Sequence, residues 1–120
     1  MLQTEPDPLS PARLAQLDPS VRAHPRPGPV VYYVRNALAG DGSPIKIGTT
    51  VDLPLRMERL QRRQPALLAE LLAWEPGGLP EEARRHREFR AARLQGEWHW
   101  PDLALLAHVY RLQEEASSWR

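Results

Sequence analysis

The sequence predicts an α+β fold in which a small three-stranded antiparallel sheet is flanked by helices. Runs of β-branched and aromatic residues around a glycine- and aspartate-rich turn indicate a hairpin that begins at Val30. Segments with apolar residues at helical spacing follow it. The chain has 120 residues and no cysteine, which suits one small domain and excludes a disulfide framework, a thiolate zinc site and a cysteine nucleophile.

Residues 1–29 form a proline-rich leader before the expected domain, residues 30–118. Seven of the 13 prolines lie in the leader, where Ser10 can cap a short helix that continues through Leu14 and Leu17. The start of the chain lacks the cationic and apolar regions of a signal peptide, and no apolar run approaches the ~20 residues that span a bilayer. We therefore expect a cytoplasmic protein that does not contact a membrane.

The predicted hairpin has strands at residues 30–35 and 45–50, joined by the turn-rich stretch 36–44. Side chains alternate between the two faces of a strand, so Ile45 and Ile47 share one face and Lys46 points to the other. One face is expected to pack against the core, and the face of Lys46 is expected to be available for chemistry.

A helix is predicted from Asp52, which can cap it, to about residue 63. Its core-facing residues and its basic stripe lie on different faces: Leu53, Met57 and Leu60 against Arg56, Arg59 and Arg63. Residues 66–75 fit either a helix or a buried strand. We expect a strand, because prolines and glycines bound the segment closely and a hairpin needs a third strand to be stable.

A second helix is predicted from Leu79 to about residue 94, before Gly96. Proline and two glutamates in its first turn suit a helix start. Four residues at steps of four, three and four line one face: Glu82, His86, Phe89 and Arg93. A last helix, residues 102–115, carries apolar residues at helical spacing and is expected to pack on the core.

The 16 basic residues are 15 arginines and one lysine, against 15 acidic residues. Four arginines fall within residues 56–63 and five within residues 84–93. Such clusters are typical of phosphate-binding surfaces, although solvated helices of an arginine-rich protein have a similar composition. The candidate nucleic-acid contacts are Arg56, Arg59, Arg63, Arg90 and Arg93. The expected partner is DNA, with RNA left open.

Five motifs occur in a fixed order over residues 30 to about 110. They are a first-strand tyrosine, Tyr32; Lys-Ile-Gly at 46–48; Arg56; a helical Glu82 followed by His86 and Phe89; and Gly-Glu-Trp at 96–98. Their order and spacing resemble the GIY-YIG nuclease superfamily, and most closely its phage-type branch, in which KIG replaces YIG. Each motif alone is common, but the ordered set is specific.

The resemblance implies a divalent-metal-dependent endonuclease with Tyr32, Lys46, Arg56, Glu82 and His86 as its catalytic set. Glu82 would hold Mg²⁺ or Mn²⁺, which accept a lone carboxylate together with several waters. Tyr32 would act as general base or orient the attacking water, and the basic role demands a lowered pKa. Lys46 would hold that water or the tyrosine, and Arg56 would bind the scissile phosphate through its planar fork.

These residues also have ordinary structural interpretations. Tyr32 could pack on the core, Lys46 could be a solubilising edge-strand lysine, and His86 could be a hydrogen-bonded helix residue. We expect Glu97 and Trp98 to lock the helix end onto the sheet, with a direct catalytic role for Glu97 as the alternative.

The chain departs from the family at Val30, where a glycine is usual, and at Leu60, where many members carry histidine. The alternative function is therefore a catalytically weak or inactive nucleic-acid-binding or protein-interaction module on the same fold. In both cases specificity would need a protein partner or a homodimer, because a leader of 29 residues can hardly form a DNA-binding domain. We expect Tyr32, Lys46, Arg56 and Glu82 to converge on one face of the sheet.

Overall fold

A computed structural model of the chain describes residues 28–40 and 42–118. The elements in chain order are β1 (Val30–Asn36), the 3₁₀ turn η1 (Ala37–Ala39), β2 (Ile45–Thr50), α3 (Leu53–Arg63), β3 (Ala69–Pro76), α4 (Leu79–Glu88), the 3₁₀ turn η2 (Arg90–Ala92), β4 (Arg93–Gln95), β5 (Trp98–His99) and α5 (Leu103–Ser118). Residues 1–27 of the leader, including its expected short helix, lie outside the described residues.

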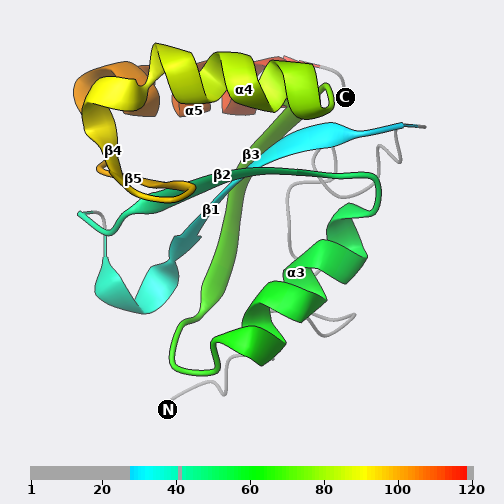
Figure 1. The fold of residues 1–120 in the computed structure, drawn as a ribbon, viewed down its shortest axis with the longest axis vertical. Helices are drawn as coiled ribbons and strands as arrows, with labels where there is room; N and C mark the ends of the chain where they lie inside the picture. Colours follow the sequence, from blue (N-terminus) through cyan, green and yellow to red (C-terminus); the bar gives the residue numbers. More distant parts are fainter. Residues whose placement is uncertain (1–27, 41, 119–120) are drawn as a thin grey trace.

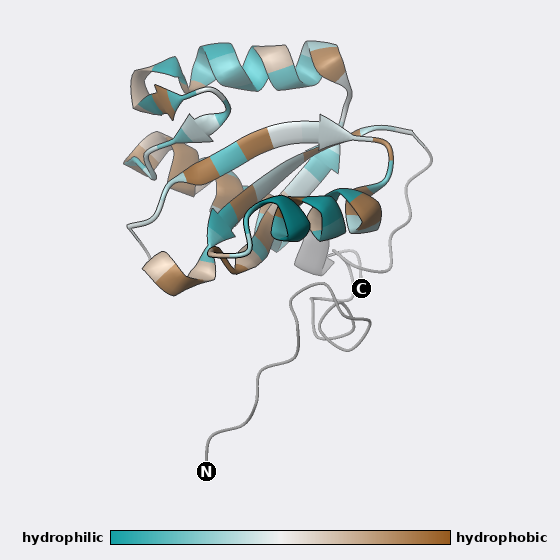
Figure 2. Cartoon of the chain, turned by 60° about the horizontal axis from the view of Figure 1, so that its bottom comes forward, coloured by the Kyte–Doolittle hydropathy of each residue, from teal (hydrophilic) through white to brown (hydrophobic). Residues whose placement is uncertain are grey.

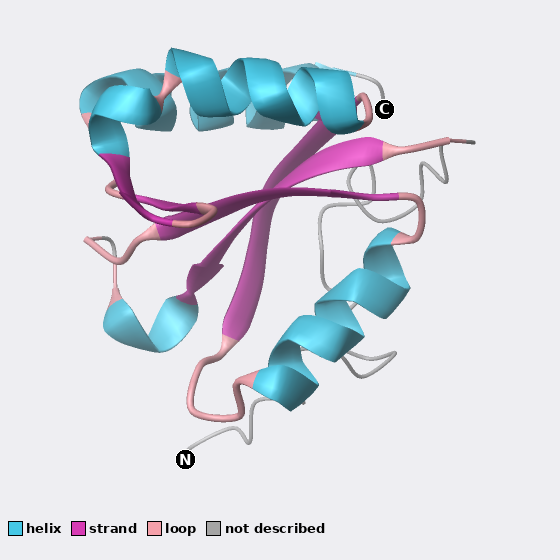
Figure 3. Cartoon of the chain, in the orientation of Figure 1, coloured by secondary structure: helices cyan, strands magenta, loops and turns pink. Residues whose placement is uncertain are grey.

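The strands form one antiparallel sheet with the order β3-β1-β2-β5-β4. Helices α4 and α5 cover one face of the sheet, and α3 covers part of the other (Figures 1 and 3). The α+β class is confirmed, but the expected count of three strands is wrong. β4 and β5 add a short hairpin, and strands of three and two residues are too short to produce a recognisable alternation.

Both faces of β1 are buried. Val31 and Tyr33 pack with Phe89, just after α4, and with the apolar residues of α5, whereas Tyr32 and Val34 pack on the side of α3, near Met57. The face that carries Tyr32 and Lys46 is therefore partly packed. The expectation that this face is wholly available for chemistry is wrong. Figure 2 shows that α3 and α4 are largely hydrophilic outside these contacts.

The sequence predicts α3 and β3 closely. α3 begins after Asp52, whose side chain accepts a hydrogen bond from the Leu55 amide at 3.1 Å, and it ends at Arg63. The ambiguous segment after it is a strand. α4, however, ends at Glu88 and not near residue 94, because the chain turns at Phe89 and Ala92 then pairs with Trp100 through a 2.7 Å backbone hydrogen bond.

Within the described residues, no helix combines the length and apolar character that a membrane crossing requires.

Candidate functional site

The ring of Tyr32 lies against Gly48, its cross-strand partner on β2. Tyr32 is completely buried. A Cβ atom added to Gly48 would lie 2.4 Å from the Tyr32 hydroxyl oxygen and 2.5 Å from Cζ. No side chain fits there, so the glycine of the Lys-Ile-Gly motif is required by the close approach of the tyrosine.

Arg56 contacts the same tyrosine from α3. Its Nη1 donates a hydrogen bond of 3.3 Å to the Tyr32 hydroxyl, and its guanidinium carbon lies 5.9 Å from the ring centroid. Burial nevertheless raises the pKa of Tyr32, and the cationic Arg56 and Lys46 offset this only in part. Without a bound cation, the pKa of Tyr32 is therefore not lowered, because desolvation disfavours the phenolate.

Lys46 lies beside both the tyrosine and the β4–β5 hairpin. Its Nζ donates to Glu97 Oε1 at 2.6 Å and lies 5.8 Å from the centroid of the Trp98 ring. β2 has β1 on one side and β5 on the other at this position. Lys46 is thus not on an edge strand, which removes the solubilising interpretation of this residue.

Glu82, His86 and Glu97 bring one ligand atom each within 4.8 Å of one another. Glu82 and His86 lie one turn apart on α4, and Glu97 lies in the turn between β4 and β5. β2 positions two of the three: the Ile47 amide donates to the Glu97 carbonyl at 2.9 Å, and the Ile47 carbonyl lies 3.0 Å from His86 Nε2.

The contact with Ile47 sets the tautomer of His86. A carbonyl oxygen can only accept, so Nε2 donates, and in the neutral ring Nδ1 then carries the lone pair. A backbone acceptor that holds one ring nitrogen while the other keeps its lone pair is the usual arrangement of a metal-binding histidine.

The electrostatics of the site also suit a cation. Burial and the neighbouring Glu97 carboxylate raise the pKa of Glu82, while His86 and Lys46 oppose this effect. A divalent ion would relieve the repulsion between two carboxylates that share a site. Two carboxylates with one imidazole form a donor set that Mg²⁺ or Mn²⁺ can use, with the nitrogen favouring Mn²⁺.

The site lies at the outer edge of β2, and its residues come from both layers of the molecule. Tyr32, Lys46 and Arg56 belong to the side of α3. Glu82 is a residue of α4, the helix that covers the opposite face (Figure 1). The expectation that all four share one face is therefore wrong. β5 pairs with β2 only at Ile45 and Lys46 and leaves the following residues of that edge without a neighbouring strand in the described part of the chain. Lys46 and Glu97 can therefore act on Glu82 from one side and on Tyr32 from the other.

Sequence reasoning underrated Glu97. It was expected chiefly to hold the end of a helix, yet it ion-pairs with Lys46 and faces Glu82. The signal that could have identified it was its place in the Gly-Glu-Trp motif, directly after Gly96, whose φ of 57° makes the turn.

The candidate nucleic-acid contacts do not form one stripe. Arg59 and Arg63 are exposed on α3, Arg56 is half-buried beside Tyr32, and Arg90 and Arg93 are exposed on η2 and β4. Arg93 also supports its own hairpin, since its Nε donates to the Gly96 carbonyl at 3.1 Å.

Arg85 belongs to a buried polar network and not to a phosphate-binding cluster. It donates to both oxygens of Glu75, at 3.0 and 2.7 Å. Glu75 also accepts from Tyr33 and from His108 Nε2, the latter at 3.1 Å. Although burial favours the protonated form, hydrogen bonds from His108, Arg85 and Tyr33 lower the pKa of Glu75 to about 2.

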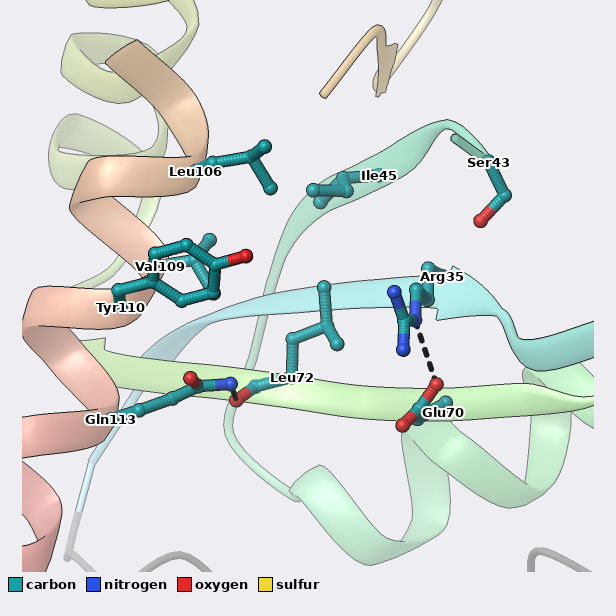
Figure 4. A pocket seen from close by; sticks show the side chains of 9 residues that line it. All are labelled: Arg35, Ser43, Ile45, Glu70, Leu72, Leu106, Val109, Tyr110 and Gln113. Atoms are coloured by element: carbon teal, nitrogen blue, oxygen red, sulfur yellow. Dashed lines mark hydrogen bonds and ion pairs between the residues drawn. The ribbon is translucent and has the colours of Figure 1, made fainter. Parts of the chain in front are cut away.

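A cavity of about 270 Å³ lies elsewhere, between the sheet and α5. Figure 4 shows the side chains that line it, including the ion pair of Arg35 Nε with Glu70 at 2.7 Å. It contains none of the residues of the candidate site.

Comparisons with protein-family models, with curated proteins and with solved structures gave no match. The functional interpretation therefore depends on the motifs and on the geometry described above.

Proposed function

We propose that this chain is a divalent-metal-dependent endonuclease that hydrolyses DNA phosphodiester bonds in the manner of GIY-YIG nucleases. The observation that carries the proposal is the group of three metal-type ligands, Glu82, His86 and Glu97, beside a hydrogen-bonded tyrosine and arginine. Lys46 connects the two parts, because it ion-pairs with Glu97 and acts electrostatically on Tyr32.

Each side chain has a role that its chemistry allows. Glu82, Glu97 and His86 would hold Mg²⁺ or Mn²⁺, which would supply counter-charge to the phosphate and acidify a bound water. Arg56 offers two parallel donors to the scissile phosphate. Lys46 would move from Glu97 toward the reacting oxygens when the carboxylate takes up the metal.

Tyr32 acts in its protonated form in this proposal. Its raised pKa means that the phenol keeps its proton near neutral pH, so it orients the attacking water or donates a hydrogen bond to the phosphate. Its oxygen accepts from Arg56, which directs the phenolic hydrogen away from the guanidinium. The role of orienter is thus favoured over that of general base.

The burial of Tyr32 and its raised pKa favour a second candidate function, a nucleic-acid-binding or protein-interaction module with weak or no cleavage. A completely buried tyrosine with a raised pKa is a poor base, and the sequence lacks the usual glycine at Val30.

One experiment separates the two functions. Purified protein is incubated with plasmid, single-stranded and branched DNA in the presence of Mg²⁺, Mn²⁺ or EDTA. Nicking that requires a metal and falls by orders of magnitude in Glu82→Gln supports the nuclease. Glu58→Gln, which removes an exposed carboxylate that pairs with Arg62 on α3, is the matched control. DNA binding without cleavage under every metal would support the alternative function instead.

A further inference from the structure

Two tryptophans border the candidate site but have no role in the chemistry above. Trp98 lies beside Lys46, and its ring centroid is 5.8 Å from Nζ. Trp100, two residues later, exposes 51% of its surface. A single exposed indole is common on protein surfaces, but one that follows Trp98 by two residues offers a second aromatic ring near Lys46.

The strand geometry places both indoles on one side of the sheet. His99 points toward α4, where its ring meets that of His86 at a centroid distance of 5.1 Å. The Trp100 amide continues the hairpin by donating to the Ala92 carbonyl at 2.7 Å. Because side chains alternate along an extended strand, Trp98 and Trp100 project to the face opposite His99, which is the face that carries Lys46 and Tyr32.

Within residues 28–40 and 42–118, no α-helix covers that part of the face. α3 lies under the other end of the sheet, and the β4–β5 hairpin extends beyond it (Figure 1). The surroundings offer positive charge from Lys46 and from Arg56. The surface thus combines aromatic rings with cations, immediately beside Glu97.

We propose that Trp98 and Trp100 stack on unpaired bases, and that the substrate of this site is single-stranded DNA. The inference rests on the proposed function and deepens it by naming the substrate class. The bases of a duplex are stacked on one another and present no free ring face, whereas every base of a single strand can stack on an indole. The arginines and Lys46 would follow the phosphates of the same strand.

The test measures binding and does not need cleavage. Fluorescence anisotropy in Ca²⁺ compares a 12-nucleotide oligothymidylate, an abasic strand of equal length and a 12-base-pair duplex. Trp100→Ala should weaken binding of the oligothymidylate by about 5- to 50-fold and leave the duplex within about twofold, and Trp100→Phe should restore most of the affinity. Tyr110→Ala removes an aromatic of similar exposure, 57%, from α5 on the other layer and is the matched control.

Three outcomes would overturn the proposal. They are an abasic strand that binds as tightly as the oligothymidylate, a loss in Trp100→Ala no larger than that in Tyr110→Ala, and an oligouridylate that binds more tightly than the oligothymidylate. Failure of the proposed function would give a different result. A protein without metal-dependent cleavage would still bind the oligothymidylate in a manner that depends on its bases and on Trp100.

Discussion

At the scale of single residues, the carboxylates of Glu82 and Glu97 repel each other within one site. Both lie within reach of His86, and the pKa of Glu82 is raised by burial and by its neighbour. Lys46 compensates one of the two charges through its contact with Glu97. Because Lys46 balances only one of the two carboxylates, a metal ion would stabilise this site.

The first prediction concerns Glu82→Gln in the absence of metal. Because the pKa of Glu82 is higher in the folded state, its ionisation costs stability, and this cost grows as the pH rises above about 4.5. The variant should therefore be more stable than wild type in EDTA at pH 7, and the difference should vanish near pH 4. Urea unfolding at the two pH values measures it.

Addition of Mn²⁺ should make wild type more stable than Glu82→Gln, the reverse of their order in EDTA. Wild type gains thermal stability by mass action when it binds the ion, whereas Glu82→Gln gains little. Glu58→Gln should behave as wild type in both conditions. Equal stabilisation of all three proteins by Mn²⁺ would show that the ion binds elsewhere.

A second prediction uses the contact between Gly48 and Tyr32. In Gly48→Ala the new methyl group would meet the phenol at 2.4 to 2.5 Å, so the ring must move and its hydrogen bond with Arg56 must change. We expect a loss of about 1–3 kcal/mol in the free energy of unfolding.

Gly42→Ala is the control for that substitution, because nothing lies within 4 Å of the added Cβ. Its stability should stay within about 0.5 kcal/mol of wild type. Denaturant unfolding measures both variants. A Gly48→Ala protein as stable as Gly42→Ala would mean that the tyrosine does not lie on the glycine in solution.

At the scale of elements, the sequence predicts the helices and strands whose own residues carry a local pattern. α3 has a capping aspartate and an apolar stripe, and β2 has alternating isoleucines, so both agree with the structure. The β4–β5 hairpin has no such signal. Its conformation depends on pairing with β2, a long-range contact that residues 93–99 do not encode locally. The contacts of Glu97 with Lys46 and Glu82 depend on the same pairing, and only the Gly-Glu-Trp motif pointed to this residue.

The network of Glu75 ties β3 to α4 and α5, and it carries the third prediction. The folded-state pKa of about 2 lies below the ordinary value of 4.5, so the stabilisation is complete above about pH 4.5 and is lost as the pH falls toward 2. The difference corresponds to about 3 kcal/mol. Glu75→Gln should lose a similar amount at pH 7, because it leaves Arg85 buried without its carboxylate partner.

The pH dependence distinguishes this network from an ordinary ion pair. Wild type should lose stability steeply between pH 4.5 and pH 2.5, and Glu75→Gln should show a flatter profile over the same range. Glu70→Gln, which affects the partly exposed pair with Arg35, should cost no more than about 1 kcal/mol. Parallel pH profiles of wild type and Glu75→Gln would contradict the assignment.

At the scale of the whole molecule, the sheet separates two polar centres with different environments. The buried network of Glu75 lies between the sheet and α4 and α5, where its charges satisfy one another. The candidate site lies at an incompletely paired edge of the sheet, where residues from both layers meet. An edge position gives a long, charged substrate access that an interior cavity would not allow.

The exposed arginines of α3 lead to the last prediction. Arg59 and Arg63 share the helix of Arg56, which contacts Tyr32, so a strand that reaches the site can pass along this helix. Each phosphate contact contributes about 0.7 to the slope of log affinity against log salt for a single strand. The double variant Arg59→Ala/Arg63→Ala should therefore lower that slope by about 1.4 for an oligothymidylate.

Arg84→Ala is the control on the other layer. It removes an exposed arginine of α4 that lies 3.6 Å from Glu81, and it should leave the slope unchanged. Equal losses from the two layers would indicate diffuse attraction by net charge, and an unchanged slope in the double variant would place the path of the strand elsewhere.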